Sequence, residues 1–190
     1  MMPLLIILVI IVAIVVIVLL MWLGYYNRFV ILSNRIKNSL AQIDVQLKKR
    51  ADLVPNLIET VKGYMKHEAK MIKEVSDARK ALVSANTTGD MTKRIKAGDA
   101  LQSALKTIFA IAENYPNLKA NENFVKLQEE LTAIEDKIAY ARQFYNDSIL
   151  SFDNAVQTIP GKWFAGRFRL EAGKYIKIPE QERQVVKVKF

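Results

Sequence analysis

The chain has 190 residues, no cysteine and one histidine, and its 28 Lys and Arg outnumber 19 Asp and Glu to give a formal net charge of +9. The lack of cysteine excludes disulfides, zinc–thiolate sites and cysteine nucleophiles, and a lone histidine argues against His-rich metal sites and a His-based triad. The positive charge does not indicate a nucleic-acid binder, because the basic residues are interleaved with acids and no nucleic-acid-binding fingerprint is present.

Residues 4–24 are predicted to form a transmembrane helix. From residue 4 to residue 23 the sequence is almost entirely Leu, Ile and Val and carries no charge. About 20 residues in an α-helix span roughly 30 Å, the hydrocarbon thickness of a bilayer. Trp22, Tyr25 and Tyr26 then fall at headgroup depth, where amphipathic rings prefer to lie.

The flanks predict a retained anchor and its orientation. No Ala-x-Ala cleavage site follows the apolar run, which is also longer than the core of a signal peptide. Arg28, Arg35 and Lys37 follow it, so the positive-inside tendency places residues 1–3 outside and residues 25–190 in the cytoplasm, although long domains sometimes translocate regardless of charge. The run has no Gly-x-x-x-Gly pattern, so any oligomer is expected to form through the soluble helices.

Residues 25–159 are predicted to form an antiparallel, up-and-down helical bundle of about four long helices, which makes the fold class all-α. Apolar residues recur there at intervals of three and four, in stripes covering residues 29–47, 54–82, 95–112 and 124–156. Residues 86–90 are expected to form a loop, with Asp90 as the next N-cap. Pro116 ends the third helix, Asn121 or Asn123 can cap the fourth, and Pro160 follows its end.

Residues 48–55 leave two alternatives open. Asp52 can cap a new helix that has Pro55 in its first turn, which the charged cluster at residues 48–50 and the bundle geometry favour. Alternatively, one helix runs from Phe29 to about Ala85 with a kink at Pro55, because the apolar spacing carries through. The turn is the preferred interpretation.

Residues 160–190 form a basic, aromatic segment and a tail. The segment interleaves aromatic with basic residues, a composition suited to an interfacial membrane contact: Lys162, Trp163, Phe164, Arg167, Phe168 and Arg169. The alternative is that these aromatic side chains cover the open end of the bundle. The tail after residue 175 is expected to be extended or disordered.

Three stretches resemble the LemA family of bacterial membrane proteins: residues 50–64 (RADLVPNLIETVKGY), 113–128 (ENYPNLKANENFVKLQ) and 134–146 (IEDKIAYARQFYN). The resemblance implies a single-span protein of the bacterial inner membrane, with its N-terminus outside and a helical bundle in the cytoplasm. It implies no established catalytic activity. Genes of relatives often lie near a membrane zinc protease and one branch accompanies magnetosome membranes, which suggests membrane organisation or envelope protein quality control.

The motif residues suggest a polar network at the margin of the core. On the fourth helix, Glu135, Arg142 and Asn146 flank the apolar stripe at intervals of two turns and one turn. Asn56 and Asn114 can contribute amides. Such a network is expected to fix the register of the bundle, with a docking or catalytic pocket as the alternative.

The leading functional hypothesis is a non-enzymatic, membrane-anchored scaffold or interaction protein. Its partners are expected to be the lipid bilayer, further copies of itself or another membrane protein, such as a membrane protease, and not nucleic acid. We predict no catalytic residue, cofactor or metal ligand. The first alternative is a membrane-bound hydrolase with clustered carboxylates. The second, which the sequence favours less, is a basic nucleic-acid-binding module.

Overall fold

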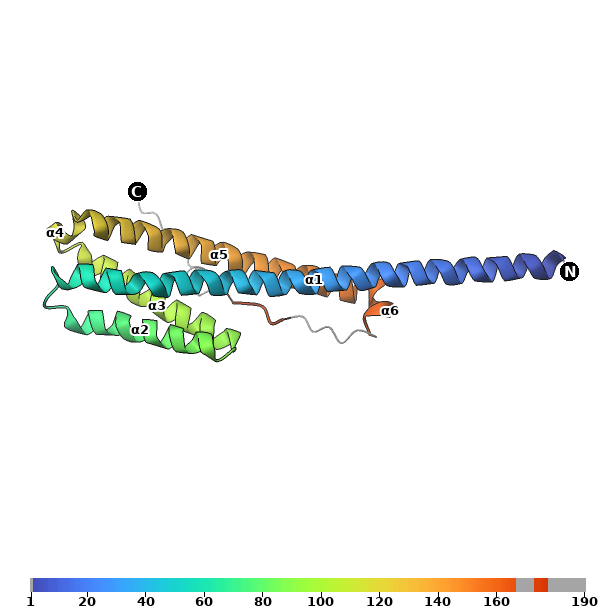
Figure 1. Ribbon diagram of the computed structural model, residues 1–190, viewed down its shortest axis with the longest axis horizontal. Coiled ribbons are helices and arrows are strands. Elements are labelled where there is room, and N and C mark those ends of the chain that lie inside the picture. Colours follow the sequence, from blue (N-terminus) through green and yellow to red (C-terminus); the bar gives the residue numbers. More distant parts are fainter. Residues whose placement is uncertain (1, 167–172, 178–190) are drawn as a thin grey trace, which may run out of the picture. The chain divides into compact units, whose positions relative to one another are not determined.

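The computed structural model describes residues 2–166 and 173–177, and these residues contain helices and no strand. The helices are α1 (Met2–Lys62), α2 (Ala69–Thr87), α3 (Met91–Ala112), α4 (Pro116–Lys119), α5 (Glu122–Gln157) and α6 (Gly161–Ala165) (Figure 1). The predicted all-α class, with an apolar N-terminal helix followed by further helices, is confirmed.

The chain divides into two compact units. Unit 1 combines Met1–Leu40 with Gln143–Ile176, and unit 2 is built mainly from Ala41–Arg142. Helices α1 and α5 contribute to both units, whereas α2, α3 and α4 belong to unit 2.

Helix α1 runs through residues 48–55 without a break, so the turn preferred from the sequence is wrong. Pro55 has no backbone N–H and leaves the carbonyl of Ala51, four residues earlier, without its helical donor. Arg79 on α2 supplies the missing donor, because its Nε–H donates to the Ala51 oxygen at 2.8 Å. The buried stripe Leu47, Ala51, Val54 therefore continues through the proline.

The break in the helix lies instead at residues 63–68. The N–H groups of Tyr64 and Met65 donate to the Val61 carbonyl at 3.0 and 2.8 Å and close the end of α1. Met65 is fully buried in this turn. The predicted second stripe, residues 54–82, is thus divided between the end of α1 and α2.

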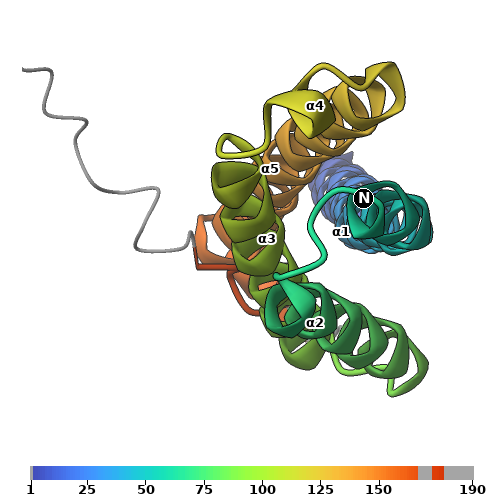
Figure 2. The ribbon, with the colours of Figure 1, turned by 90° about the vertical axis from the view of Figure 1, so that its left-hand side faces the viewer.

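In unit 2, the end of α1 lies beside α2, α3 and the first half of α5 (Figure 2). Gly89 turns the chain between α2 and α3 with a φ of +71°. The Asp90 side chain then accepts from the N–H groups of Thr92 and Lys93, as predicted for an N-cap. Asn121 likewise accepts from the N–H of Phe124 at 3.1 Å. The buried core takes members from every predicted stripe, including Ile43, Val61, Val75, Leu82, Leu101, Leu105, Ile108, Leu131 and Ile138.

In unit 1, the part of α1 before Leu40 packs against the second half of α5 through Phe29, Tyr145, Ile149 and Phe152, all buried. The side chains of residues 4–12 and 14–23 are exposed by contrast. In the part of the chain that the structure describes, α1 is the one helix that is long and apolar enough to cross a membrane.

The Arg79 contact predicts a coupling that a double-mutant cycle can measure. Arg79→Met removes the donor but keeps most of the stem, so the buried Ala51 carbonyl loses a partner at a cost of about 1–3 kcal/mol. In a Pro55→Ala background the restored N–H takes over the carbonyl, and the cost of Arg79→Met should fall by about 1 kcal/mol. Urea unfolding of the detergent-solubilised protein, followed by circular dichroism, measures both values. Equal costs in the two backgrounds would contradict the assignment.

Candidate functional site

An aromatic junction forms in unit 1 where the exposed apolar run of α1 ends. We use this name for Trp22, Tyr25, Tyr26, Trp163 and Phe164. Tyr25 stacks on Phe164 of α6, with ring centroids 5.4 Å apart and an interplanar angle of 18°. Trp22 stacks on Tyr26 one turn away, at 6.0 Å and 14°. The short helix after α5 therefore reaches α1 at the level of Tyr25.

Glycine at position 161 allows this arrangement. A Cβ atom added there would lie 2.0 Å from the carbonyl oxygen of Ala155, closer than any side chain tolerates. With α6 seated in this way, Phe164 is partly buried while Trp163 is 73% exposed. Lys162 is exposed beside them.

Three further residues of the predicted membrane interface, Arg167, Phe168 and Arg169, lie outside the described residues. The contact of this segment with lipid stays a prediction.

Asn146 holds an extended segment of unit 1 against α5. Its amide nitrogen donates to the Ile176 carbonyl at 2.9 Å, and its amide oxygen accepts from the Ile176 N–H, also at 2.9 Å. The side chain thus pairs with the backbone as a neighbouring strand would. Ile176 is buried, and the Tyr175 hydroxyl donates to Asp153 at 3.1 Å.

Tyr145 completes this clamp. Its hydroxyl donates to the Lys174 carbonyl at 3.3 Å. Burial raises the pKa of the Tyr145 phenol above its ordinary value, so the hydroxyl keeps its proton and remains a donor at neutral pH.

Arg50 is the most deeply buried charged residue described in unit 2, with 1% of its surface exposed. Its guanidinium forms an ion pair with Glu135 of α5 and also donates to the Gly98 carbonyl of α3 at 3.2 Å. Burial lowers the pKa of Arg50, while the Glu135 carboxylate opposes that shift by favouring the charged form.

Two more arginines repeat the arrangement on neighbouring helices. Arg142 of α5 donates to Asp99 of α3 at 2.5 Å, and Arg94 of α3 pairs with Asp44 of α1. We call Arg50, Arg94, Arg142 and their three carboxylate partners the arginine network. Each pair of helices among α1, α3 and α5 is therefore joined by one arginine–carboxylate pair.

The five residues of the predicted polar network do not lie together but in different parts of the structure. Glu135 and Arg142 belong to the arginine network, but each pairs with a residue that the sequence analysis did not single out. Asn146 holds the extended segment, and Asn114 is exposed just after α3. Arg50 had a readable signal, because it lies three residues after Leu47 and four before Val54, on the buried stripe of α1.

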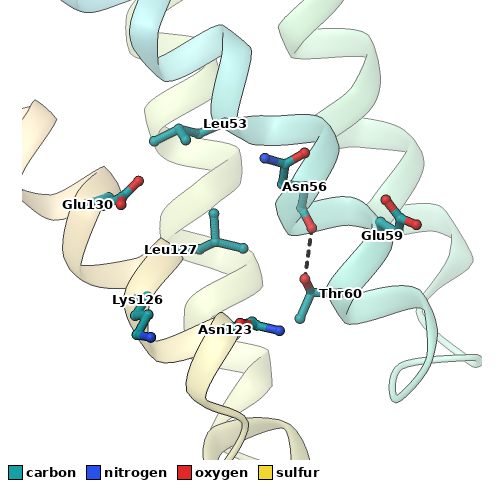
Figure 3. A pocket seen from close by; sticks show the side chains of 8 residues that line it. All are labelled: Leu53, Asn56, Glu59, Thr60, Asn123, Lys126, Leu127 and Glu130. Atoms are coloured by element: carbon teal, nitrogen blue, oxygen red, sulfur yellow. Dashed lines mark hydrogen bonds between the residues drawn. The ribbon is translucent and has the colours of Figure 1, made fainter.

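Asn56 lies in a groove of about 450 Å³ between α1 and α5 of unit 2. Figure 3 shows the lining side chains facing one another across it, with the Asn56 carbonyl accepting from the Thr60 hydroxyl at 2.8 Å. The lining mixes carboxylates, amides, a lysine and two leucines: Leu53, Asn56, Glu59, Thr60, Asn123, Lys126, Leu127 and Glu130. Among the described residues, no group of three or more His, Cys, Asp or Glu side chains is placed to hold a metal ion.

The structure contains one apolar helix of membrane-spanning length, and the same helix continues into a group of packed helices. These features place the chain in the class of helical proteins with a candidate membrane anchor. The sequence pattern of the LemA family matches residues 39–190. The chain therefore belongs to the LemA family.

The relatives agree with this membership. The chain is 25% identical over 163 residues to "Magnetosome protein MamQ" of Magnetospirillum gryphiswaldense, covering 74% of this chain and 60% of that protein. It is 24% identical over 139 residues to "Protein LemA" of Metamycoplasma hominis, covering 73% and 62%. "Magnetosome protein MamQ 2" of Paramagnetospirillum magneticum is 23% identical, covering 74% and 60%. The match thus spans about three fifths of the length of these curated relatives.

The burial of Arg50 predicts a large effect of removing its partner. Glu135→Gln removes the paired carboxylate of a buried guanidinium and should lower the free energy of unfolding by about 3 kcal/mol. Asp77→Asn is the matched control, because Asp77 and its partner Lys80 are 54% and 72% exposed and such pairs contribute about 1 kcal/mol or less. Urea unfolding compares the two variants. Similar small losses for both would show that the network does not hold the bundle.

Proposed function

We propose that this protein is a non-enzymatic, membrane-anchored scaffold or interaction protein at the cytoplasmic face of the bacterial inner membrane. Residues 4–24 cross the bilayer, and the helical units offer surfaces to further copies or to another membrane protein. The process served is membrane organisation or envelope protein quality control.

The observation that carries the proposal is the exposed apolar run of α1, which ends at the aromatic junction. Burying the 17 Leu, Ile and Val side chains of residues 4–23 in hydrocarbon removes from water a continuous apolar surface that the described chain leaves exposed. Trp22, Tyr26 and Trp163 then lie at one end of the run, as aromatic side chains do at a membrane–water interface. The relatives named as magnetosome proteins add support for a role at a membrane.

Contact of α6 with lipid can be measured through Trp163. In a Trp22→Phe background Trp163 is the single tryptophan, and lipids brominated near the headgroup should quench its emission in reconstituted full-length protein. Gly161→Ala forces α6 away from Ala155 and should reduce the quenching. Gly166→Ala is the control, because nothing lies within 4 Å of a Cβ at that position. Unquenched Trp163 emission would show that α6 covers protein and does not touch lipid.

The cysteine-free chain allows a direct test of orientation. A single cysteine at the exposed position 117 (Asn117→Cys) should react with a membrane-impermeant maleimide only after cells are permeabilised. A cysteine at position 2 (Met2→Cys) should react in intact cells. The reverse pattern would place the bundle outside and overturn the predicted topology.

A further inference from the structure

Unit 2 carries a lysine groove between the end of α1 and α2. Its volume is about 460 Å³, and its floor contains the buried side chains of Met65 and Ile72. The lining includes four exposed lysines, Lys62, Lys66, Lys73 and Lys80. Asp77 is the one acidic residue that lines it, and it pairs with Lys80 at 3.4 Å. The groove therefore combines an apolar floor with an excess of positive charge.

An acidic stripe runs along the outer face of α5 in the same unit. Glu122, Glu129 and Asp136 are exposed and follow one another at seven-residue intervals, so they share one face of the helix. Val125 and Tyr140 lie on this face and are 38% and 69% exposed. We call these five residues the acidic stripe.

In the part of the chain that the structure describes, the stripe is not neutralised. None of its three acids forms an ion pair with a described residue. Lys126 and Lys137 lie on one flank, and Lys126 lines the separate groove between α1 and α5. The stripe faces away from the core, because Phe124, Leu131 and Ile138 are buried on the opposite side of the helix.

We propose that the acidic stripe of one copy seats in the lysine groove of a second copy. Lys73 and Lys80 on α2 are seven residues apart, as are Glu129 and Asp136 on α5. At 1.5 Å per residue, each pair spaces its charges by about 10.5 Å along the helix axis, so two ion pairs form in one register. Val125 and Tyr140 supply apolar surface to meet the floor of the groove.

The two surfaces differ, so the contact is heterologous: the copy that supplies the stripe keeps a free groove, and the copy that supplies the groove keeps a free stripe. Such contacts close into rings or extend into open arrays. The inference deepens the proposed scaffold and rests on it for the anchoring of all copies in one membrane. It names the two surfaces, the acidic stripe and the lysine groove, through which copies of the scaffold assemble.

A disulfide between differently tagged full-length copies tests the contact in membranes. One copy carries Ala69→Cys in the groove and the other carries Val125→Cys in the stripe, in a chain that has no other cysteine. Oxidation should give a disulfide-linked heterodimer on a non-reducing gel. The control pairs Ala69→Cys with Lys106→Cys, an exposed position on α3, and should give little product.

Charge reversal decides whether the complementary charges drive the contact. Lys73→Glu with Lys80→Glu in the groove copy should reduce the heterodimer at least about tenfold, because like charges then face each other. Adding Glu129→Lys and Asp136→Lys to the stripe copy should restore it. Lys48→Glu with Lys49→Glu changes the net charge equally on exposed positions of α1 and should leave the yield unchanged.

Three results would overturn the inference: a yield no higher than that of the control pair, a yield insensitive to reversal in the groove, or a loss that the reversed stripe does not restore. The last would assign the groove to an anionic lipid or another polyanion. Recovery of the chains in the soluble fraction would instead contradict the membrane anchoring in the proposed function. Oxidation of the Ala69→Cys and Val125→Cys copies in that fraction would still show whether the groove and the stripe are in contact.

Discussion

The arginine network is the constraint on which unit 2 depends. Stripes of Leu, Ile and Val pack well in several relative positions, because one apolar side chain substitutes readily for another. A buried guanidinium has no such freedom, since its donors must meet acceptors in a fixed geometry. With one arginine–carboxylate pair between each two of α1, α3 and α5, the axial position and rotation of all three helices are set together.

A second constraint keeps the membrane-length segment and the bundle on one helix. Pro55 disfavours a continuous α1, and the Nε–H of Arg79 offsets part of that cost by donating to the Ala51 carbonyl, which has lost its helical donor. The same contact ties α2 to α1 at the buried residue Ala51. The carbonyl that Pro55 leaves without a donor in α1 thus accepts a hydrogen bond from α2.

The spacing of the apolar residues predicted most of the fold, because each helix buries one face and apolar residues recur along that face at intervals of three and four. Asp90 and Asn121 were also predictable as caps, since capping depends on residues two or three positions away. The continuity of α1 was only the second alternative, because the donor that replaces the N–H of Pro55 comes from Arg79, which lies 24 residues further along the sequence. The partners of Glu135 and Arg142 were missed for the same reason: Arg50 and Asp99 come from other helices.

The extended segment beside α5 illustrates how a backbone contact can still be selective. Asn146 forms hydrogen bonds only with the backbone N–H and carbonyl of Ile176. By itself it would bind the segment equally well after a shift of two residues, because such a shift keeps the same edge of the segment toward α5. Gly173 opposes that slip. A Cβ at its position would lie 2.4 Å from the Tyr145 hydroxyl, and a shift by two residues would bring Tyr175 there. The absence of a side chain at position 173 thus acts together with the buried Ile176 and the Tyr175–Asp153 hydrogen bond to set where this segment docks.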